Sequence, residues 1–319
     1  MIDTSVRTAF ESMAISGKGD ASALAAGLRR NVTGVGLRAL AAKLVHVAVC
    51  APARLIDVYD GAAHGWLSGI LYPPGTRNTK NDRPPEAFWE AFWQVLEQPA
   101  ADRRRGAFTL ATARLAGLLD PQINARVAAT TADFRGVREA AARGLLERID
   151  VRDLAGMPPS TLGGVVHREA MVRGQLGRIL DPAALSLDTL PAPLGYLNAR
   201  ILESHLVWAT VAGYSHAELD ELALAAFQMA QFGHHYSSLL LALTMTTIAM
   251  ERPEGLEIVL ESIFRGWLHG RETRPLLGVA WSELWDLPID AVRQSLGVTL
   301  FPSPLAAAVR QASRTRGSP

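Results

Sequence analysis

Apolar positions recur with the period of an α-helix in several separate stretches of this chain. Over residues 86–98, one helical face collects Phe88, Trp89, Phe92, Trp93 and Leu96. Residues 134–149 and 254–269 repeat the pattern, with charged side chains opposite. Alternating Val, Ile and Thr positions joined by hairpin dipeptides are missing. The pattern predicts an all-α fold, a helical bundle-like single domain with an extra N-terminal helical segment.

One stretch predicts two helices joined by a tight turn. Gly213 is a natural stop for a helix over residues 193–212. Ser215 and Glu218 have the spacing of a capping box, which predicts a second helix running at least to Gln231. Antiparallel helices joined this closely bring side chains together across the turn.

Two side chains are expected to meet across this turn, His205 from the first helix and Glu221 from the second. A buried carboxylate needs a partner. Either an ion pair with Arg200 or His205, or ligation of a metal, would satisfy Glu221, whereas His205 alone is most simply a hydrogen-bonded core histidine.

The segment of residues 72–85 is rich in Pro, Asn, Gly and charge, which is typical of a linker. It divides an N-terminal helical extension and linker, residues 1–80, from a helical domain over residues 81–302. Residues 303–319 are expected to form a loose tail.

The longest apolar run, residues 239–250, is 12 residues long, short of the ~20 that cross a bilayer. Residues 39–56 are also apolar but contain Lys43 and Pro52. A buried helix is the favoured interpretation of this second stretch. The alternative is a basic amphipathic helix on a membrane surface.

Composition excludes several protein classes. Hydrophobic residues make up 49% and charged residues 20%, as in globular proteins. A net charge of +1 argues against nucleic-acid partners. The single cysteine, Cys50, excludes an internal disulfide and a Cys-rich zinc site. The first residues lack the apolar core of a signal peptide. We expect a cytoplasmic protein, with a peripheral position at the inner face of the membrane as an extension.

Residues 204–231 resemble the coenzyme Q (ubiquinone) biosynthesis protein 4 family, whose metal-binding signature is His-Asp-x-x-His, then eleven residues, then Glu. His205 matches the first His, and Glu221 falls at the spacing of the Glu. Gly213 and Tyr214 match a Gly-aromatic pair of the family.

Three further segments, residues 99–108, 157–171 and 265–298, resemble family motifs in the same order along the chain. The likeness extends roughly over residues 85–298.

Two positions depart from the signature, with Leu206 in place of the Asp and Ala209 in place of the second His. A zinc-type site wants three or four ligands, and only His205 and Glu221 remain. We therefore expect no metal and no other cofactor. Zinc would bind only if the site were rescued, as by Leu206→Asp with Ala209→His.

Other side chains are candidates for recruitment to a metal. His216 and Asp220 lie one turn apart on the second helix. His234 and His235 would come near only if the helix breaks at Gly233.

The resemblance implies an all-helical protein at a membrane face that holds a polyprenyl quinone precursor or another apolar ligand. Such a protein assists ring decarboxylation and hydroxylation, or scaffolds the biosynthetic enzymes that perform them. We expect a homodimer, with the membrane surface and these enzymes as partners. The alternative is a diverged enzyme of another pathway, with His205 and Glu221 as an acid–base pair.

The apolar replacements predict that the former metal site has become the wall of a ligand pocket. Its expected lining is Arg200, Leu206, Trp208, Ala209 and Gln228. An elongated apolar cavity is expected to run from His205 and Glu221 along residues 222–250.

Overall fold

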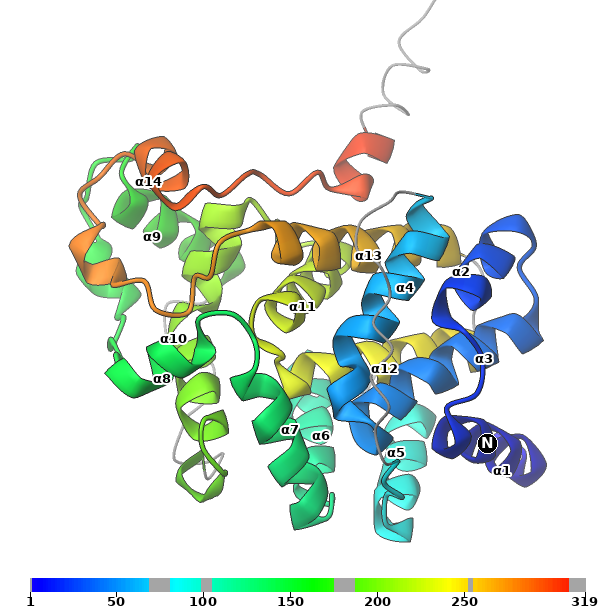
Figure 1. The fold of residues 1–319 in the computed structure, drawn as a ribbon. Helices are drawn as coiled ribbons and strands as arrows, with labels where there is room; N and C mark the ends of the chain where they lie inside the picture. Colours follow the sequence, from blue (N-terminus) through cyan, green and yellow to red (C-terminus); the bar gives the residue numbers. More distant parts are fainter. Residues whose placement is uncertain (1, 69–80, 99–104, 175–186, 252–254, 310–319) are drawn as a thin grey trace, which may run out of the picture.

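The computed structural model describes residues 2–68, 81–98, 105–174, 187–251 and 255–309, which are mostly helical (Figure 1). The α-helices are α1 (Thr4–Ser16), α2 (Ala21–Arg30), α3 (Gly34–Val45), α4 (Leu55–Leu67), α5 (Glu86–Glu97), α6 (Arg105–Gly117), α7 (Pro121–Ala132), α8 (Val137–Arg143), α9 (Leu162–Arg173), α10 (Leu194–Ala212), α11 (Glu218–Phe232), α12 (His235–Glu251), α13 (Leu256–Glu272) and α14 (Ile289–Leu296). Shorter helical pieces are His46–Cys50, Pro52–Arg54, Val151–Leu154, Leu187–Thr189 and Trp281–Glu283. Within the described ranges no strand forms, and an isolated bridge joins Thr161 to Pro288. The all-α prediction is confirmed.

Side-chain caps start several of these helices where the sequence provides a short polar residue. Asp20 accepts a hydrogen bond from the backbone of Ala23 at the start of α2. Thr161 accepts one from the backbone of Gly164 at the start of α9. Each cap satisfies a backbone N–H that has no partner inside its helix.

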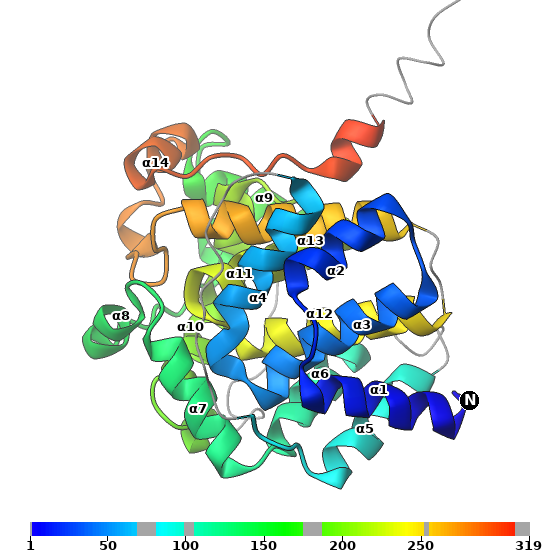
Figure 2. The ribbon, with the colours of Figure 1, turned by 45° about the vertical axis from the view of Figure 1, so that its right-hand side comes forward.

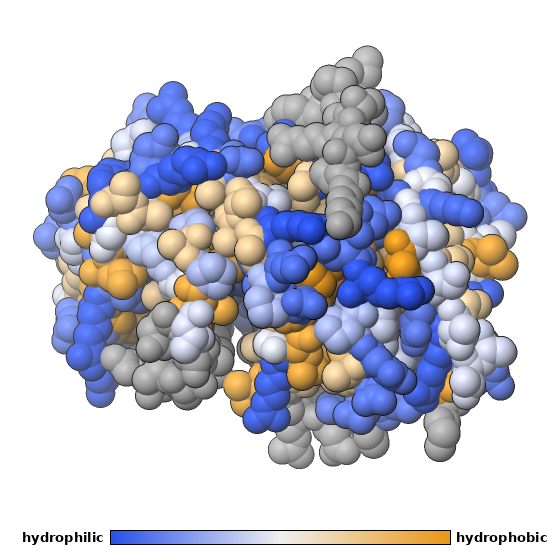
Figure 3. Space-filling view, turned by 60° about the horizontal axis from the view of Figure 1, so that its bottom comes forward, coloured by the Kyte–Doolittle hydropathy of each residue, from blue (hydrophilic) through white to orange (hydrophobic). Residues whose placement is uncertain are grey.

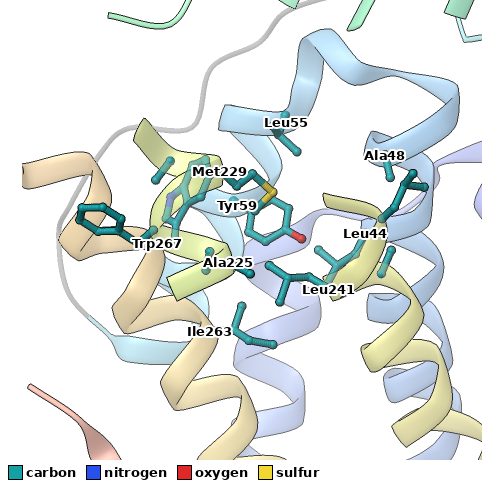
Figure 4. Close-up of a cluster of buried hydrophobic side chains, with 14 of the residues drawn as sticks. Leu44, Ala48, Leu55, Tyr59, Ala225, Met229, Leu241, Ile263 and Trp267 are labelled. Carbon is teal, nitrogen blue, oxygen red and sulfur yellow. The ribbon is translucent and has the colours of Figure 1, made fainter. Parts of the chain in front are cut away.

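The centre of the molecule is built by α11, α12 and α13. Helix α11 packs most extensively on α13, and this contact is close because glycines replace larger residues on α13. A Cβ added to Gly266 would lie 2.2 Å from the carbonyl oxygen of Ala223, and one on Gly270 would lie 2.5 Å from that of Phe227. Figure 4 shows apolar side chains from α11, α12 and α13 meeting in this core.

Helices from the N-terminal part of the chain contribute to the same core. Helix α3 lies along α12, and α4 packs against α13 (Figures 1 and 2). The rings of Tyr59 on α4 and Trp267 on α13 have centroids 5.0 Å apart. The indole of Trp267 also donates a hydrogen bond to buried Asp60, over 2.7 Å. The division at residue 80 remains a prediction, but α1–α4 share one hydrophobic cluster with the later helices.

Two predicted helices have different bounds. The periodic stretch of residues 134–149 forms only α8, because Gly136 and Gly144 adopt left-handed φ values of 80° and 63° on either side of it. In residues 39–56, α3 ends at Val45 and a π-helical turn, His46–Cys50, leads to Pro52, which cannot donate to a continuing helix.

Lys43 on α3 is buried and donates to the carbonyl of Gly17. Residues 39–56 are therefore a core segment, as the favoured interpretation predicts. The alternative of an amphipathic helix lying on a membrane is wrong for this stretch.

The apolar run of residues 239–250 lies in α12, where most of its side chains pack inward. Among the helices described, none combines the length and apolarity needed to cross a membrane. On the face shown in Figure 3, apolar residues lie scattered among hydrophilic ones.

Candidate functional site

The predicted pair of helices and the tight turn between them are confirmed. Helix α10 ends at Gly213, which has a φ of 78°, and the backbone N–H of Tyr214 donates to the carbonyl of Ala209 over 2.9 Å. The Tyr214 ring is buried against Phe227 of the next helix. This packing holds the turn against α11.

The capping box predicted at Ser215 is wrong. Helix α11 begins at Glu218 with Ala217 as the N-cap residue. The Ser215 hydroxyl instead donates to a carboxylate oxygen of Asp220 over 2.6 Å, and the Ser215 backbone N–H donates to the same oxygen. Because buried Asp220 needs hydrogen-bond donors, it draws Ser215 away from the helix start. Glu221 consequently lies in the first turn of α11.

His205, Glu221 and Gln228 form one network across the helix pair. Nε2 of His205 lies 3.6 Å from Oε2 of Glu221. Nδ1 of His205 lies 2.9 Å from the side-chain nitrogen of buried Gln228. An amide N–H donated to Nδ1 leaves the imidazole proton on Nε2, facing the carboxylate. The side chains of His205 and Glu221 are 32% and 28% exposed, so a ligand can reach both.

A fourth member, Arg173 in the last turn of α9, was not predicted from the sequence. Its Nη1 donates to Oε1 of Glu221 over 2.7 Å, and its Nη2 donates to the carbonyl of Tyr214 over 2.9 Å. The side chain is 3% exposed. An arginine just before Gly174 looks like an ordinary helix end, so no local signal marks it as the partner of Glu221.

Arg200, the other cation considered for Glu221, belongs to a different network. Its guanidinium is fully buried, with Nη1 2.9 Å from Oε2 of Glu147. It also donates to the carbonyls of Leu277 and Val279. Arg200 therefore fastens the segment after α13 to α10 and is not joined to His205 by any of these bonds.

Glu147 completes the Arg200 network. Its carboxylate accepts hydrogen bonds from the backbone N–H groups of Trp281 and Ser282 and from the Ser282 hydroxyl. Burial acts to raise the pKa of Glu147, but the hydrogen bonds from Ser282, Trp281 and Arg200 outweigh it and lower the pKa below its usual range. The carboxylate is thus held charged beside a buried guanidinium.

The other expected pocket residues pack tightly. Trp208 and Ala209 are fully buried, and the Trp208 ring lies 5.0 Å from that of Phe232. Leu206 is half-buried beside the core. Trp208 and Ala209 are thus core residues.

Helix α11 is in close contact with α13, so the elongated apolar cavity predicted along residues 222–250 does not lie between these two helices. A cavity of about 10 Å³ lies between Val47, Val127 and Ser238, room for one water at most. A more open hollow of about 270 Å³ lies between α1 and α3.

Candidate metal recruits are dispersed. His216 is exposed, and Asp220 is bound by Ser215 and Ser303. Helix α11 does break at Gly233. Even so, the His234 imidazole is buried with Nδ1 2.8 Å from the Ser237 hydroxyl, and burial lowers its pKa to about 3.

His235 is 2.8 Å from the Ala48 carbonyl oxygen. In the described ranges, no group of three or more His, Cys, Asp or Glu side chains could hold a metal ion.

Comparison with known proteins gives the following matches. Residues 191–302, which include α10 to α14, match the family model of the coenzyme Q (ubiquinone) biosynthesis protein Coq4. The mitochondrial ubiquinone biosynthesis protein COQ4 of Eremothecium gossypii is 26% identical over 159 residues, 48% of this chain and 46% of that protein. The chain thus spans about half the length of this curated relative.

A crystal structure of a candidate ubiquinone biosynthesis protein from Nostoc punctiforme superposes with a TM-score of 0.53. It is 24% identical in sequence, and the match covers 66% of this chain and 97% of that one. This likeness shows the fold.

Proposed function

We propose, from the match of residues 191–302 to the coenzyme Q biosynthesis protein 4 family, that this chain binds an apolar aromatic intermediate of quinone biosynthesis. The ring of the intermediate docks at His205 and Glu221, and the protein presents it to the enzymes that modify it. Family-type metal chemistry is not part of this function.

The observation that carries the proposal is the half-exposed His205–Glu221 pair within the family-matching segment. A protonated Nε2 and a carboxylate side by side offer one donor and one acceptor, which suit a phenol or a ring carboxyl group. Half-buried Leu206 lies next to His205 in the chain and supplies apolar surface for a prenylated ring.

Binding of a short-chain prenylated phenol to the purified protein tests this proposal. We expect saturable binding by the wild type and roughly 2- to 10-fold weaker binding by His205→Ala, since a hydrogen bond between neutral groups is worth ~0.5–1.5 kcal/mol. His216→Ala is the matched control, because His216 is exposed on the adjoining turn. No binding by the wild type, or equal loss in the control, would contradict the proposal.

A second candidate function is acid–base catalysis on an apolar small molecule. The 3.6 Å approach of Nε2 to the Glu221 carboxylate favours it. Incubation of a prenylated phenol with the wild type and with Glu221→Gln separates the two functions. The binding proposal predicts that both proteins leave the phenol chemically unaltered, whereas catalysis predicts turnover by the wild type that Glu221→Gln abolishes.

A further inference from the structure

The carboxylate of Glu221 is held between two nitrogen groups from different helices. Oε1 accepts a hydrogen bond from Nη1 of Arg173 over 2.7 Å, and Oε2 lies 3.6 Å from Nε2 of His205. Arg173 also binds the carbonyl of Tyr214 in the turn. One buried guanidinium therefore ties α9 to both the α10–α11 turn and α11.

This arrangement does not fit the divalent metal that the family signature implies. Of the four signature positions, His205 and Glu221 carry donor atoms, and Leu206 and Ala209 carry none. Zinc-type sites take three or four N, O or S donors. The Nδ1 atom of His205 is already engaged by Gln228.

The guanidinium adds a second obstacle to metal binding. Arginine keeps its positive charge at any ordinary pH, and here it shares the carboxylate that a metal would need. A divalent ion on Glu221 would lie a few ångströms from this fixed cation and be repelled by it.

We propose that Arg173 replaces the metal ion of the family signature. Its guanidinium neutralises Glu221, as a bound cation would, and it excludes a divalent ion. It also ties α11 and the turn before it to α9, where a metal would have joined α11 to α10. Restoring the missing ligands at residues 206 and 209 is then insufficient, because Arg173 must also be removed. The inference does not depend on which ligand the protein binds.

The test is a zinc titration of four proteins by calorimetry, with elemental analysis after dialysis. They are the wild type, the double variant Leu206→Asp/Ala209→His, and two triple variants that add either Arg173→Met or Arg168→Met. Arg168 is the matched control, an exposed arginine on the same helix that binds a backbone carbonyl.

We expect about one zinc per chain only in the triple variant with Arg173→Met. Its affinity should exceed that of the double variant and of the control triple by at least ~30-fold, taking the water limit for a single and a double charge about 4 Å apart. Stoichiometric zinc in the wild type, equal affinity in the double variant, or no zinc in a folded Arg173→Met triple variant would each overturn the proposal.

If that triple variant does not fold, thermal unfolding of simpler variants decides the question. Arg173→Met should lower the Tm of the wild type, and the loss should be at least halved when Glu221 is already Gln. An undiminished loss in the Glu221→Gln background would mean that Arg173 does not act as the cation of this carboxylate. These measurements use no aromatic ligand, so they stand apart from the binding test of the proposed function.

Discussion

Replacing Arg200 by Met should strongly destabilise the protein. The Met side chain keeps most of the apolar stem but removes the guanidinium that lies 2.9 Å from Glu147 and donates to the carbonyls of Leu277 and Val279. Arg200 is fully buried and the Glu147 side chain is 10% exposed. Breaking a buried pair from one side costs ~3–5 kcal/mol, since a charge is left unpaired.

The corresponding shift in Tm follows from the chain length. Unfolding entropy of about 2.1 cal/mol/K per residue gives about 0.7 kcal/mol/K for this chain, so the Tm should fall by about 4–7 °C. Urea unfolding and thermal unfolding by circular dichroism measure the two quantities. Arg138→Met is the control, because the Arg138–Asp133 pair is exposed and worth at most ~1 kcal/mol.

Two further measurements sharpen this prediction. Adding Glu147→Gln to Arg200→Met should recover part of the loss, because the amide carries no unpaired charge and its oxygen still accepts from Ser282, although the bond from Trp281 is lost. The folded pKa of Glu147 is lowered, so its stabilisation is complete above the unfolded pKa of about 4.3 and is lost as pH falls through the folded pKa. An Arg200→Met variant no less stable than the Arg138→Met control would refute the reasoning.

Two other predictions concern packing and pH. Gly65→Ala should destabilise by ~1–3 kcal/mol, because its Cβ would lie 2.1 Å from the carbonyl oxygen of Ser22, whereas Gly27→Ala, with nothing within 4 Å, should stabilise by ~0.5–1 kcal/mol; equal Tm values would contradict this. Burial lowers the pKa of His46 to about 4 and that of His234 to about 3. Their contribution to stability is complete above about pH 6.5 and declines as pH falls towards these values, by up to ~1.4 kcal/mol per pH unit each; urea unfolding that is unchanged between pH 7.5 and 5 would rule it out.

The sequence predicted the elements whose signals are local. Gly213 stops α10 as expected, in the left-handed conformation. The spacing of His205 and Glu221 was sufficient to predict that they meet, since the turn between their helices is short. Gln228, two turns beyond Glu221, completes the network from a position named in advance.

The features that the sequence did not predict depend on contacts between residues far apart in the chain. Arg173 reaches Glu221 from 48 positions earlier in the chain, on a helix whose orientation no local pattern encodes. The predicted capping box does not form because the Ser215 hydroxyl donates to Asp220, a carboxylate that is buried by the tertiary fold and needs donors. The close interface between α11 and α13 depends on Gly266 meeting the backbone of α11, some forty residues earlier in the chain. Helical periodicity does not reveal such a contact, so it could not show that these two helices pack without a cavity between them.

Helices α1–α4 and the later helices share one core, and this has a consequence for shorter fragments of the chain. A fragment of residues 191–302 alone would retain His205, Glu221 and Trp267, but Trp267 would lose the Tyr59 ring and the Asp60 acceptor. Exposing one such side chain costs ~1.5–3 kcal/mol. The fragment also lacks α3, so the face of α12 that α3 covers would be exposed. The segment that matches the family model is thus shorter than the unit that packs around this core, and residues 191–302 alone should be less stable than the whole chain.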